Sequence, residues 1–243
     1  MRVTPMILTV LVFAACGTPA QTDGPVASPS AGPVGRILEE IPDPVDLDGR
    51  YLIYLHNRFA ETAQPDERHP LFGDYDLHGI LEAFAERRFI VIATQREPQA
   101  DPVVWATRVA GQVERLIAAG VPPEKITVVG FSKGGAIAIL ASSRLAGNTV
   151  NFVFLAACGD WLERIPDLEP RGRMLSIIEA SDDLAGSCGD LFAVTPDGTI
   201  HHEVEIHIGG GHGAFFRTHD EWLRPTIDWA KGLPPADNQI GPD

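Results

Sequence analysis

The chain has 243 residues and is acidic, with 33 Asp and Glu against 19 Lys and Arg and a formal net charge of −14. The longest run of basic residues is the pair Arg87-Arg88, so a polyanion would be repelled, and no nucleic acid is expected as a partner. About 205 residues remain once an N-terminal stretch of low complexity is set aside, enough for one domain with a sizeable core.

The N-terminus is typical of an export signal. Arg2 precedes the apolar stretch Met6–Phe13, which is too short to cross a bilayer, and small residues stand directly before Cys16. Small residues before a cysteine resemble the bacterial lipobox, although Phe13 stands where leucine is usual. We therefore expect a lipid-anchored protein of the bacterial cell envelope, with Cys16 as the lipidated residue. Plain secretion is the alternative.

The predicted organisation follows from this reading. Residues 1–16 are expected to be the signal peptide, and residues 17–35, rich in Pro, Gly, Ser and Ala, a disordered tether. Residues 36–235 form the predicted domain, and residues 236–243 a tail. The N-terminal lipid anchor is the only contact with a membrane that the sequence predicts.

The first predicted elements form a βαβ unit. An apolar strand at residues 51–55 is followed by a helix at residues 79–88 and a second apolar strand at residues 89–93. A further helix is predicted to begin after Asp101, a good N-cap residue, and to end before Gly120.

Strands and helices continue to alternate along the rest of the chain. Strands are predicted at residues 126–130, 151–156, 174–178 and 204–208, and a last helix at residues 220–230. Strands that are apolar throughout and separated by helices indicate a parallel sheet covered on both faces. The predicted fold class is α/β, a doubly wound, mostly parallel sheet with reactive loops at the carboxyl ends of the strands.

The most informative motif is Gly130-Phe131-Ser132-Lys133-Gly134, which lies between a buried strand and a predicted helix. Strand, tight turn and helix are the context of the G-x-S-x-G nucleophile elbow, in which glycines let the strand and the helix pass close to a strained serine. Ser132 is therefore the candidate nucleophile.

A serine hydroxyl needs a base and a carboxylate to act as a nucleophile at neutral pH. The strand at residues 174–178 leads into Glu179 and then Asp182-Asp183, and the next strand leads into a glycine-rich loop with His212. We predict His212 as the base and Asp182 as the acid. Asp183 is the alternative acid. If Asp182 is the acid, we expect Asp183 or Glu179 to hydrogen-bond the groups that hold it in place or to cap the loop.

The order Ser132, Asp182, His212 resembles that of the α/β-hydrolase superfamily, and the chain is most similar to its small, lid-poor serine esterases of the dienelactone-hydrolase type. The resemblance covers about residues 47–230 and implies a Ser-His-Asp triad without metal or organic cofactor. It also implies an oxyanion hole formed by the N–H of Lys133 and by a donor after the first core strand. That donor is Asn57 or Arg58, since Asn57 stands where the family's glycine is usual.

Two further features bear on the site. Export would place Cys158 and Cys188 in an oxidising compartment, where a disulfide is plausible; the alternative is a pair of buried thiols. Several acids and histidines precede the second strand, but their spacing matches no strong metal motif, so no metal is predicted. This polar cluster consists of Asp66, His69, Asp74, Asp76 and His78.

The connection from Ala157 to about Arg173 is too short for a large lid, so an open site for small or exposed esters is expected. Lys133 beside the nucleophile and Arg58 at the oxyanion hole favour an anionic substrate; the alternative is that Lys133 is an ordinary exposed lysine of the helix. The predicted function is hydrolysis of a small-molecule carboxylic ester through an acyl-enzyme. The alternatives are an amide or lactone hydrolase with the same triad, and a non-catalytic envelope lipoprotein of the same fold.

Overall fold

The computed structural model describes residue 1 and residues 35–63, 67–145, 147 and 149–235. The predicted signal peptide, Cys16, the tether up to residue 34 and the C-terminal tail lie outside the described residues. Among the helices that are described, none is both long enough and apolar enough to cross a membrane.

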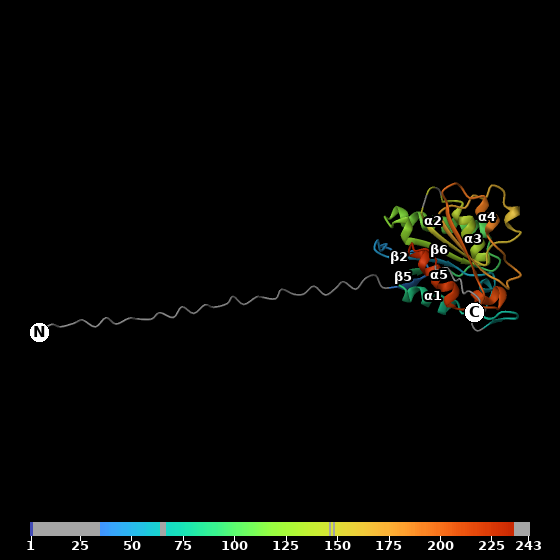
Figure 1. The fold of residues 1–243 in the computed structure, drawn as a ribbon, viewed down its shortest axis with the longest axis horizontal. Helices are drawn as coiled ribbons and strands as arrows, with labels where there is room; N and C mark the ends of the chain where they lie inside the picture. Colours follow the sequence, from blue (N-terminus) through green and yellow to red (C-terminus); the bar gives the residue numbers. More distant parts are fainter. Residues whose placement is uncertain (2–34, 64–66, 146, 148, 236–243) are drawn as a thin grey trace. The chain divides into compact units, whose positions relative to one another are not determined.

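The domain is built on a seven-stranded sheet in which every paired neighbour is parallel (Figure 1). The strand order is β1-β5-β2-β6-β7-β8-β9. The bounds are β1 Arg36–Leu38, β2 Arg50–Leu55, β5 Phe89–Ile92, β6 Ile126–Phe131, β7 Asn151–Leu155, β8 Arg173–Glu179 and β9 Ile200–Ile206. A separate two-stranded hairpin consists of β3 (Arg68–His69) and β4 (Gly73–Asp74).

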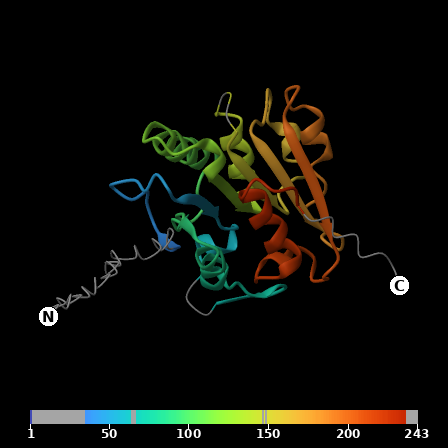
Figure 2. The same cartoon turned by 60° about the vertical axis from the view of Figure 1, so that its left-hand side comes forward.

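Helices cover both faces of the sheet (Figures 1 and 2). Helices α1 (Leu77–Glu86) and α5 (Asp220–Ala230) pack on one face, and α2 (Pro102–Ala118), α3 (Lys133–Ser142) and α4 (Gly189–Ala193) on the other. Successive strand residues alternate between the two cores: Tyr51 and Ile53 pack with α2 and α3, whereas Leu52 and Tyr54 pack with α1. Because both faces are covered, the central strands are buried and largely apolar, and the predicted fold class is confirmed.

Two helices begin at aspartate N-caps: α2 after Asp101, as predicted, and α1 at Leu77, two residues before its predicted start. Asp101 caps α2 by accepting hydrogen bonds from the N–H groups of Val103 and Val104, at 2.7 and 3.2 Å, with Pro102 at the first helical position. Asp76 caps α1 in the same way through Gly79, at 2.9 Å.

The edge strand β1, the two hairpin strands β3 and β4 and the short helix α4 were not predicted from the sequence. In addition, β9 begins at Ile200, before the predicted start at Val204. The sequence pattern missed its first half because this part of the strand is largely exposed and contains polar residues such as His201 and His202.

Candidate active site

Ser132 lies at the sharp turn between β6 and α3. Its backbone has φ 55° and ψ −118°, a conformation that costs energy for any residue with a side chain. The turn is possible because glycines flank it: a Cβ on Gly134 would lie 1.9 Å from the carbonyl oxygen of Leu55, and one on Gly130 would lie 2.2 Å from that of Gly134. The strand and the helix therefore present the hydroxyl of Ser132 at the carboxyl edge of the sheet.

Ser132, His212 and Asp182 form a continuous hydrogen-bonded chain. Nε2 of His212 lies 2.8 Å from Oγ of Ser132, and Nδ1 lies 2.8 Å from Oδ2 of Asp182. The Asp182 side chain is 1% exposed and that of His212 11% exposed. Residues from three loops, each following a different parallel strand, thus meet in the order that nucleophilic catalysis needs.

Asp182 rather than its neighbour faces the imidazole. Its other carboxylate oxygen, Oδ1, accepts hydrogen bonds from the N–H groups of Leu184 and Ala185, which fix the rotamer. Asp183 is exposed. Asp182 is therefore the acid that contacts His212.

Glu179, at the end of β8, joins the acid loop to the histidine loop. Its carboxylate accepts hydrogen bonds from the N–H of Ser181 at 2.8 Å and of Gly209 at 3.0 Å, and from the Ser181 hydroxyl at 2.5 Å. Burial by itself would raise the pKa of Glu179, but the hydrogen bonds from Ser181 and Gly209 outweigh it and lower the pKa below 4.5. The charged carboxylate of Glu179 therefore hydrogen-bonds the backbone of both the loop that carries Asp182 and the loop that carries His212.

The glycine-rich loop before His212 has the backbone that only glycine adopts easily. Gly209, Gly210 and Gly211 have φ of 77°, 91° and 55°. The loop bends sharply after β9, so that the imidazole of His212 turns back over Ser132.

The loop after β2, which is predicted to supply an oxyanion donor, is held in place by the buried side chain of His56. Nδ1 of His56 lies 2.8 Å from the carbonyl oxygen of Asn57, and Nε2 accepts a hydrogen bond from the N–H of Arg96 at 3.0 Å. Burial, and then the nearby Arg96 charge, lower the pKa of His56 to about 4, so the ring is neutral. Asn57 is buried, its side chain accepts from the N–H of Ala60, and Arg58 is exposed.

The Lys133 side chain does not extend toward an anionic substrate as the sequence had suggested. Its ammonium group lies 2.7 and 2.8 Å from the two carboxylate oxygens of Glu61, which is buried. Glu61 also binds Arg96, whose side chain is fully buried. Sequence reasoning missed Glu61 and Arg96; the one available signal was the position of Arg96, a charged residue shortly after the carboxyl end of β5.

Cys158 and Cys188 form a disulfide. It joins the loop that follows β7 to the segment between Asp182 and α4, and the N–H of Gly186 donates to the carbonyl oxygen of Cys158 beside it. The loop after β7 contains only one 3₁₀ turn, Leu162–Arg164, and no inserted lid domain. The acid loop is thus attached to a neighbouring loop at the same edge of the sheet.

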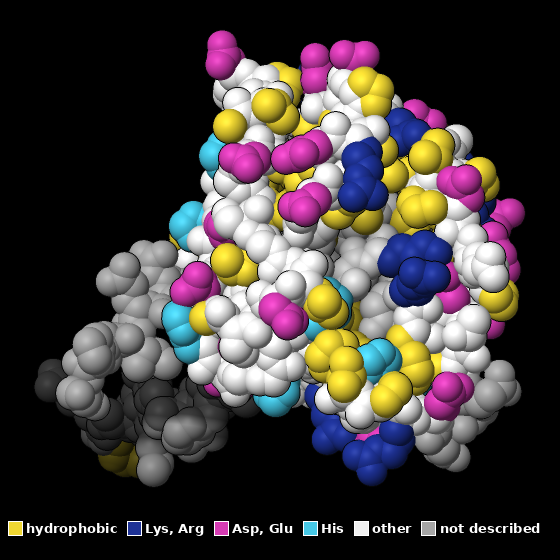
Figure 3. Space-filling model, turned by 90° about the vertical axis from the view of Figure 1, so that its right-hand side faces the viewer, with side chains coloured by type: hydrophobic (Ala, Val, Ile, Leu, Met, Phe, Trp, Pro, Cys, Tyr) yellow, Lys and Arg dark blue, Asp and Glu magenta, His cyan; other side chains and the backbone are white. Residues whose placement is uncertain are grey.

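Aromatic side chains border the histidine. Phe131 and Phe72 lie with ring centroids 5.1 and 6.0 Å from that of His212. Phe72 comes from the turn of the β3–β4 hairpin, and Leu71 beside it is 81% exposed. Figure 3 shows one face of the molecule, on which hydrophobic side chains gather around a histidine, next to Lys or Arg side chains.

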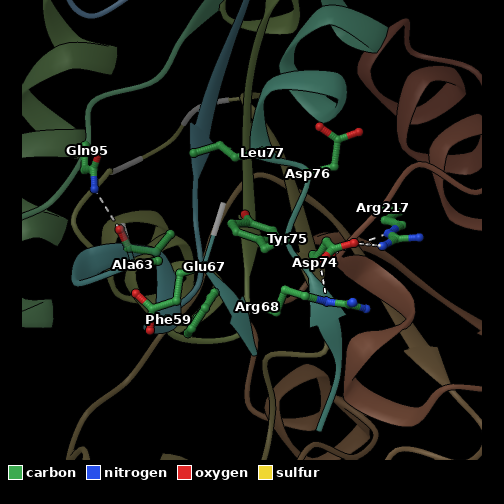
Figure 4. Close-up of a pocket in the computed structure, with 11 residues that line it drawn as sticks. Phe59, Ala63, Glu67, Arg68, Asp74, Tyr75, Asp76, Leu77, Gln95 and Arg217 are labelled. Atoms are coloured by element: carbon green, nitrogen blue, oxygen red, sulfur yellow. Dashed lines mark hydrogen bonds and ion pairs between the residues drawn. The ribbon is translucent and has the colours of Figure 1, made fainter. Parts of the chain in front are cut away.

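A cavity of about 780 Å³ is lined by the aromatic side chains of Phe59 and Tyr75 and by Asp74 and Asp76 of the polar cluster (Figure 4). Asp74 pairs with both Arg68 and Arg217, at 2.6 Å each, and Asp76 caps α1. His78 pairs with Glu82, His69 stacks on Phe72, and Asp66 lies outside the described residues. Across the described part of the chain, no three His, Cys, Asp or Glu side chains are arranged to hold a metal ion.

Comparisons with known proteins agree with this architecture. The family model of the class 3 lipases matches residues 54–159, less than half of the chain; this segment contains Ser132 but neither Asp182 nor His212. No curated protein sequence matches the chain significantly.

Two solved structures share the fold. One is a predicted CIB-like hydrolase from Thermoplasma acidophilum, at 17% identity and a TM-score of 0.50, covering 76% of this chain and 87% of that one. The other is a variant of SOBER1 from Arabidopsis thaliana, at 15% identity and a TM-score of 0.52, covering 75% and 98%. These likenesses show that the chain has the α/β-hydrolase fold.

Proposed function

We propose that this protein is a serine hydrolase that cleaves a small or exposed carboxylic ester through a covalent acyl-enzyme. The observation that carries the proposal is the chain of two 2.8 Å contacts that links Ser132, His212 and Asp182. Similarity to the class 3 lipases over residues 54–159 supports an ester as the substrate. The short loop after β7 supports an open site.

The mechanism assigns each group a role. With its proton on Nδ1 and donated to Asp182, His212 accepts the hydroxyl proton of Ser132 at Nε2 while Oγ attacks the ester carbonyl. His212 then gives that proton to the departing alcohol. A water molecule, deprotonated by the same imidazole, cleaves the acyl-enzyme, releases the acid and restores Ser132. The mechanism uses no metal or organic cofactor.

The tetrahedral oxyanion needs N–H donors that are already in place. Lys133 supplies one, because its N–H is at the start of α3, where the first N–H groups have no partner within the helix. We propose Arg58 as the second donor. Asn57 is the weaker candidate, because its backbone hydrogen-bonds the Tyr75 hydroxyl.

The cellular location is also a proposal. We infer that the protein is exported and anchored through a lipidated Cys16, with secretion as the alternative. The disulfide between Cys158 and Cys188 supports maturation in an oxidising compartment. Expression of the full chain in a bacterium, with Cys16→Ser as control, tests this: the anchor predicts a membrane fraction that the variant loses.

The test of the activity compares short p-nitrophenyl esters, lactones and aminoacyl amides as substrates. Wild-type protein is expected to turn over the esters best, and Ser132→Ala to lose at least about 10³-fold in rate. Ser143→Ala, eleven residues further along at the C-cap of α3, is the matched control and is expected to keep full activity. Equal turnover by Ser132→Ala would reject the nucleophile, and turnover of amides or lactones alone would select those alternatives.

A further inference from the structure

Three charged side chains connect the two segments that carry the proposed oxyanion donors. Glu61 contacts Lys133 on one side and Arg96 on the other. The side chains of Glu61 and Arg96 are fully buried, and that of Lys133 is 16% exposed. We propose that Glu61, Arg96 and Lys133 form an ionic clamp that positions both halves of the oxyanion hole. The proposal rests on the proposed function, and it assigns these residues to positioning rather than to contact with the substrate.

The first half of the clamp fixes the start of α3. Both carboxylate oxygens of Glu61 lie within 2.8 Å of the Lys133 ammonium, and the Glu61 side chain is 1% exposed. A doubly bound ammonium at this burial restricts the Lys133 side chain, and with it the peptide whose N–H faces the developing charge. Surface ion pairs do not restrict a backbone in this way, because solvent competes for both partners.

The second half fixes the loop after β2. Nε of Arg96 binds Glu61 at 3.1 Å, and Nη2 donates to the carbonyl oxygens of both His56 and Asn57, the latter at 3.1 Å. Two successive carbonyls therefore face one guanidinium. In a trans peptide the C=O and N–H groups point in opposite directions, so the N–H of Arg58 faces away from Arg96.

Arg96 holds the carbonyl oxygens of His56 and Asn57, so it also determines which way the N–H groups of Asn57 and Arg58 face. The backbone of Asn57 hydrogen-bonds the Tyr75 hydroxyl, which leaves the N–H of Arg58 as the proposed donor to the oxyanion. The carbonyl oxygen of Leu55 and that of His56 also lie against the position where a Cβ of Gly134 would be, so this loop and the start of α3 touch directly. Glu61 thus holds together the two segments between which the oxyanion would form.

The charge of the clamp also favours an anion. One carboxylate against an arginine and a lysine leaves a net positive charge, and His56 beside them is neutral. A buried positive charge next to the site stabilises negative charge that develops during reaction more than solvent-exposed charges can. Loss of Glu61 would leave two buried cations that repel each other and move the backbone they bind.

The experiment measures ester hydrolysis and the binding of an alkylboronic acid, which forms a tetrahedral adduct on a nucleophilic serine and places an oxygen in the oxyanion hole. In Glu61→Gln and Lys133→Met, the clamp predicts a kcat lower by about 10- to 100-fold, KM within about threefold, and boronate affinity reduced as much as kcat. Lys133→Arg, which keeps the charge, is expected to retain most of the activity. Arg108→Met breaks an exposed ion pair with Glu40 and serves as the control with no change.

The outcomes separate the clamp from the proposed function. Full kcat and full boronate affinity in folded Glu61→Gln or Lys133→Met, together with inactive Ser132→Ala, would overturn the clamp alone. Unchanged hydrolysis by Ser132→Ala would overturn the proposed function. If Glu61→Gln does not fold, Lys133→Met decides the question, because its side chain is at the more exposed end of the clamp.

Discussion

The carboxylate of Glu179 accepts a hydrogen bond from the N–H of Gly209 at 3.0 Å, across the gap between the loops that follow β8 and β9. One of these loops carries the candidate acid Asp182 and the other the candidate base His212. Their alignment therefore depends on a residue that touches neither Ser132 nor a substrate.

Replacement of Glu179 tests this dependence. In Glu179→Ala, the N–H groups of Ser181 and Gly209 lose a buried charged acceptor, so we expect a loss of about 2–3 kcal/mol in the free energy of unfolding and a lower kcat. Urea unfolding and ester hydrolysis measure the two effects. A Glu179→Ala variant as stable and as active as wild type would show that the two loops hold their geometry without this link.

The pH dependence of Glu179 has a defined sign. Its pKa is lower in the folded protein than in the unfolded chain, so its contribution to stability is present above about pH 4.5 and is lost as the pH falls through the folded value. Glu179→Gln is expected to unfold less steeply in acid than wild type. Equal slopes of stability against pH below 4.5 would contradict the assignment of a charged Glu179.

His56 predicts a second pH effect at higher pH. Its pKa falls from 6.5 to about 4 on folding, so the unfolded chain binds a proton that the folded protein does not. The stability from neutral His56 is complete above about pH 6.5 and declines as the pH falls toward 4, by about 3 kcal/mol at most. We expect a flatter stability profile between pH 4 and 6.5 in His56→Gln, with exposed His78→Gln as the unchanged control.

The glycines of the elbow allow a matched pair of substitutions. A Cβ at position 134 meets the backbone of Leu55, so Gly134→Ala is expected to lose more than about 3 kcal/mol or to fail to fold. Gly111→Ala, inside α2 with open space around it, is expected to gain about 0.5–1 kcal/mol. Thermal unfolding of both variants checks the prediction, and a stable, active Gly134→Ala protein would contradict the close approach of β2 and α3.

Sequence patterns predicted most of this fold for a physical reason. Helices separate β2, β5, β6 and β7 along the chain, and burial on both faces makes the central strands largely apolar, as in residues 126–131. The strand β1 escaped prediction because it has three residues and is mostly exposed at the sheet edge. Its hydrophobic signal is too short to distinguish from a loop.

In the candidate site, too, local sequence motifs predict some residues, whereas others come together only through tertiary packing. Ser132 and His212 lie in glycine-rich motifs whose spacing reflects backbone geometry, so they can be read from the sequence. The choice between Asp182 and Asp183 depends on the direction in which a side chain leaves a loop, and the sequence supports only a preference. Glu61 and Arg96 meet across 35 positions through tertiary packing, and no local pattern encodes that contact.

Reaction of the folded protein with a fluorophosphonate, followed by mass mapping of the adduct, tests the central claim most directly. The triad predicts one adduct on Ser132, formed much more slowly in His212→Ala and Asp182→Asn, whereas Asp183→Asn labels like wild type. A folded wild-type protein without an adduct on Ser132, or labelling of His212→Ala at the wild-type rate, would contradict it.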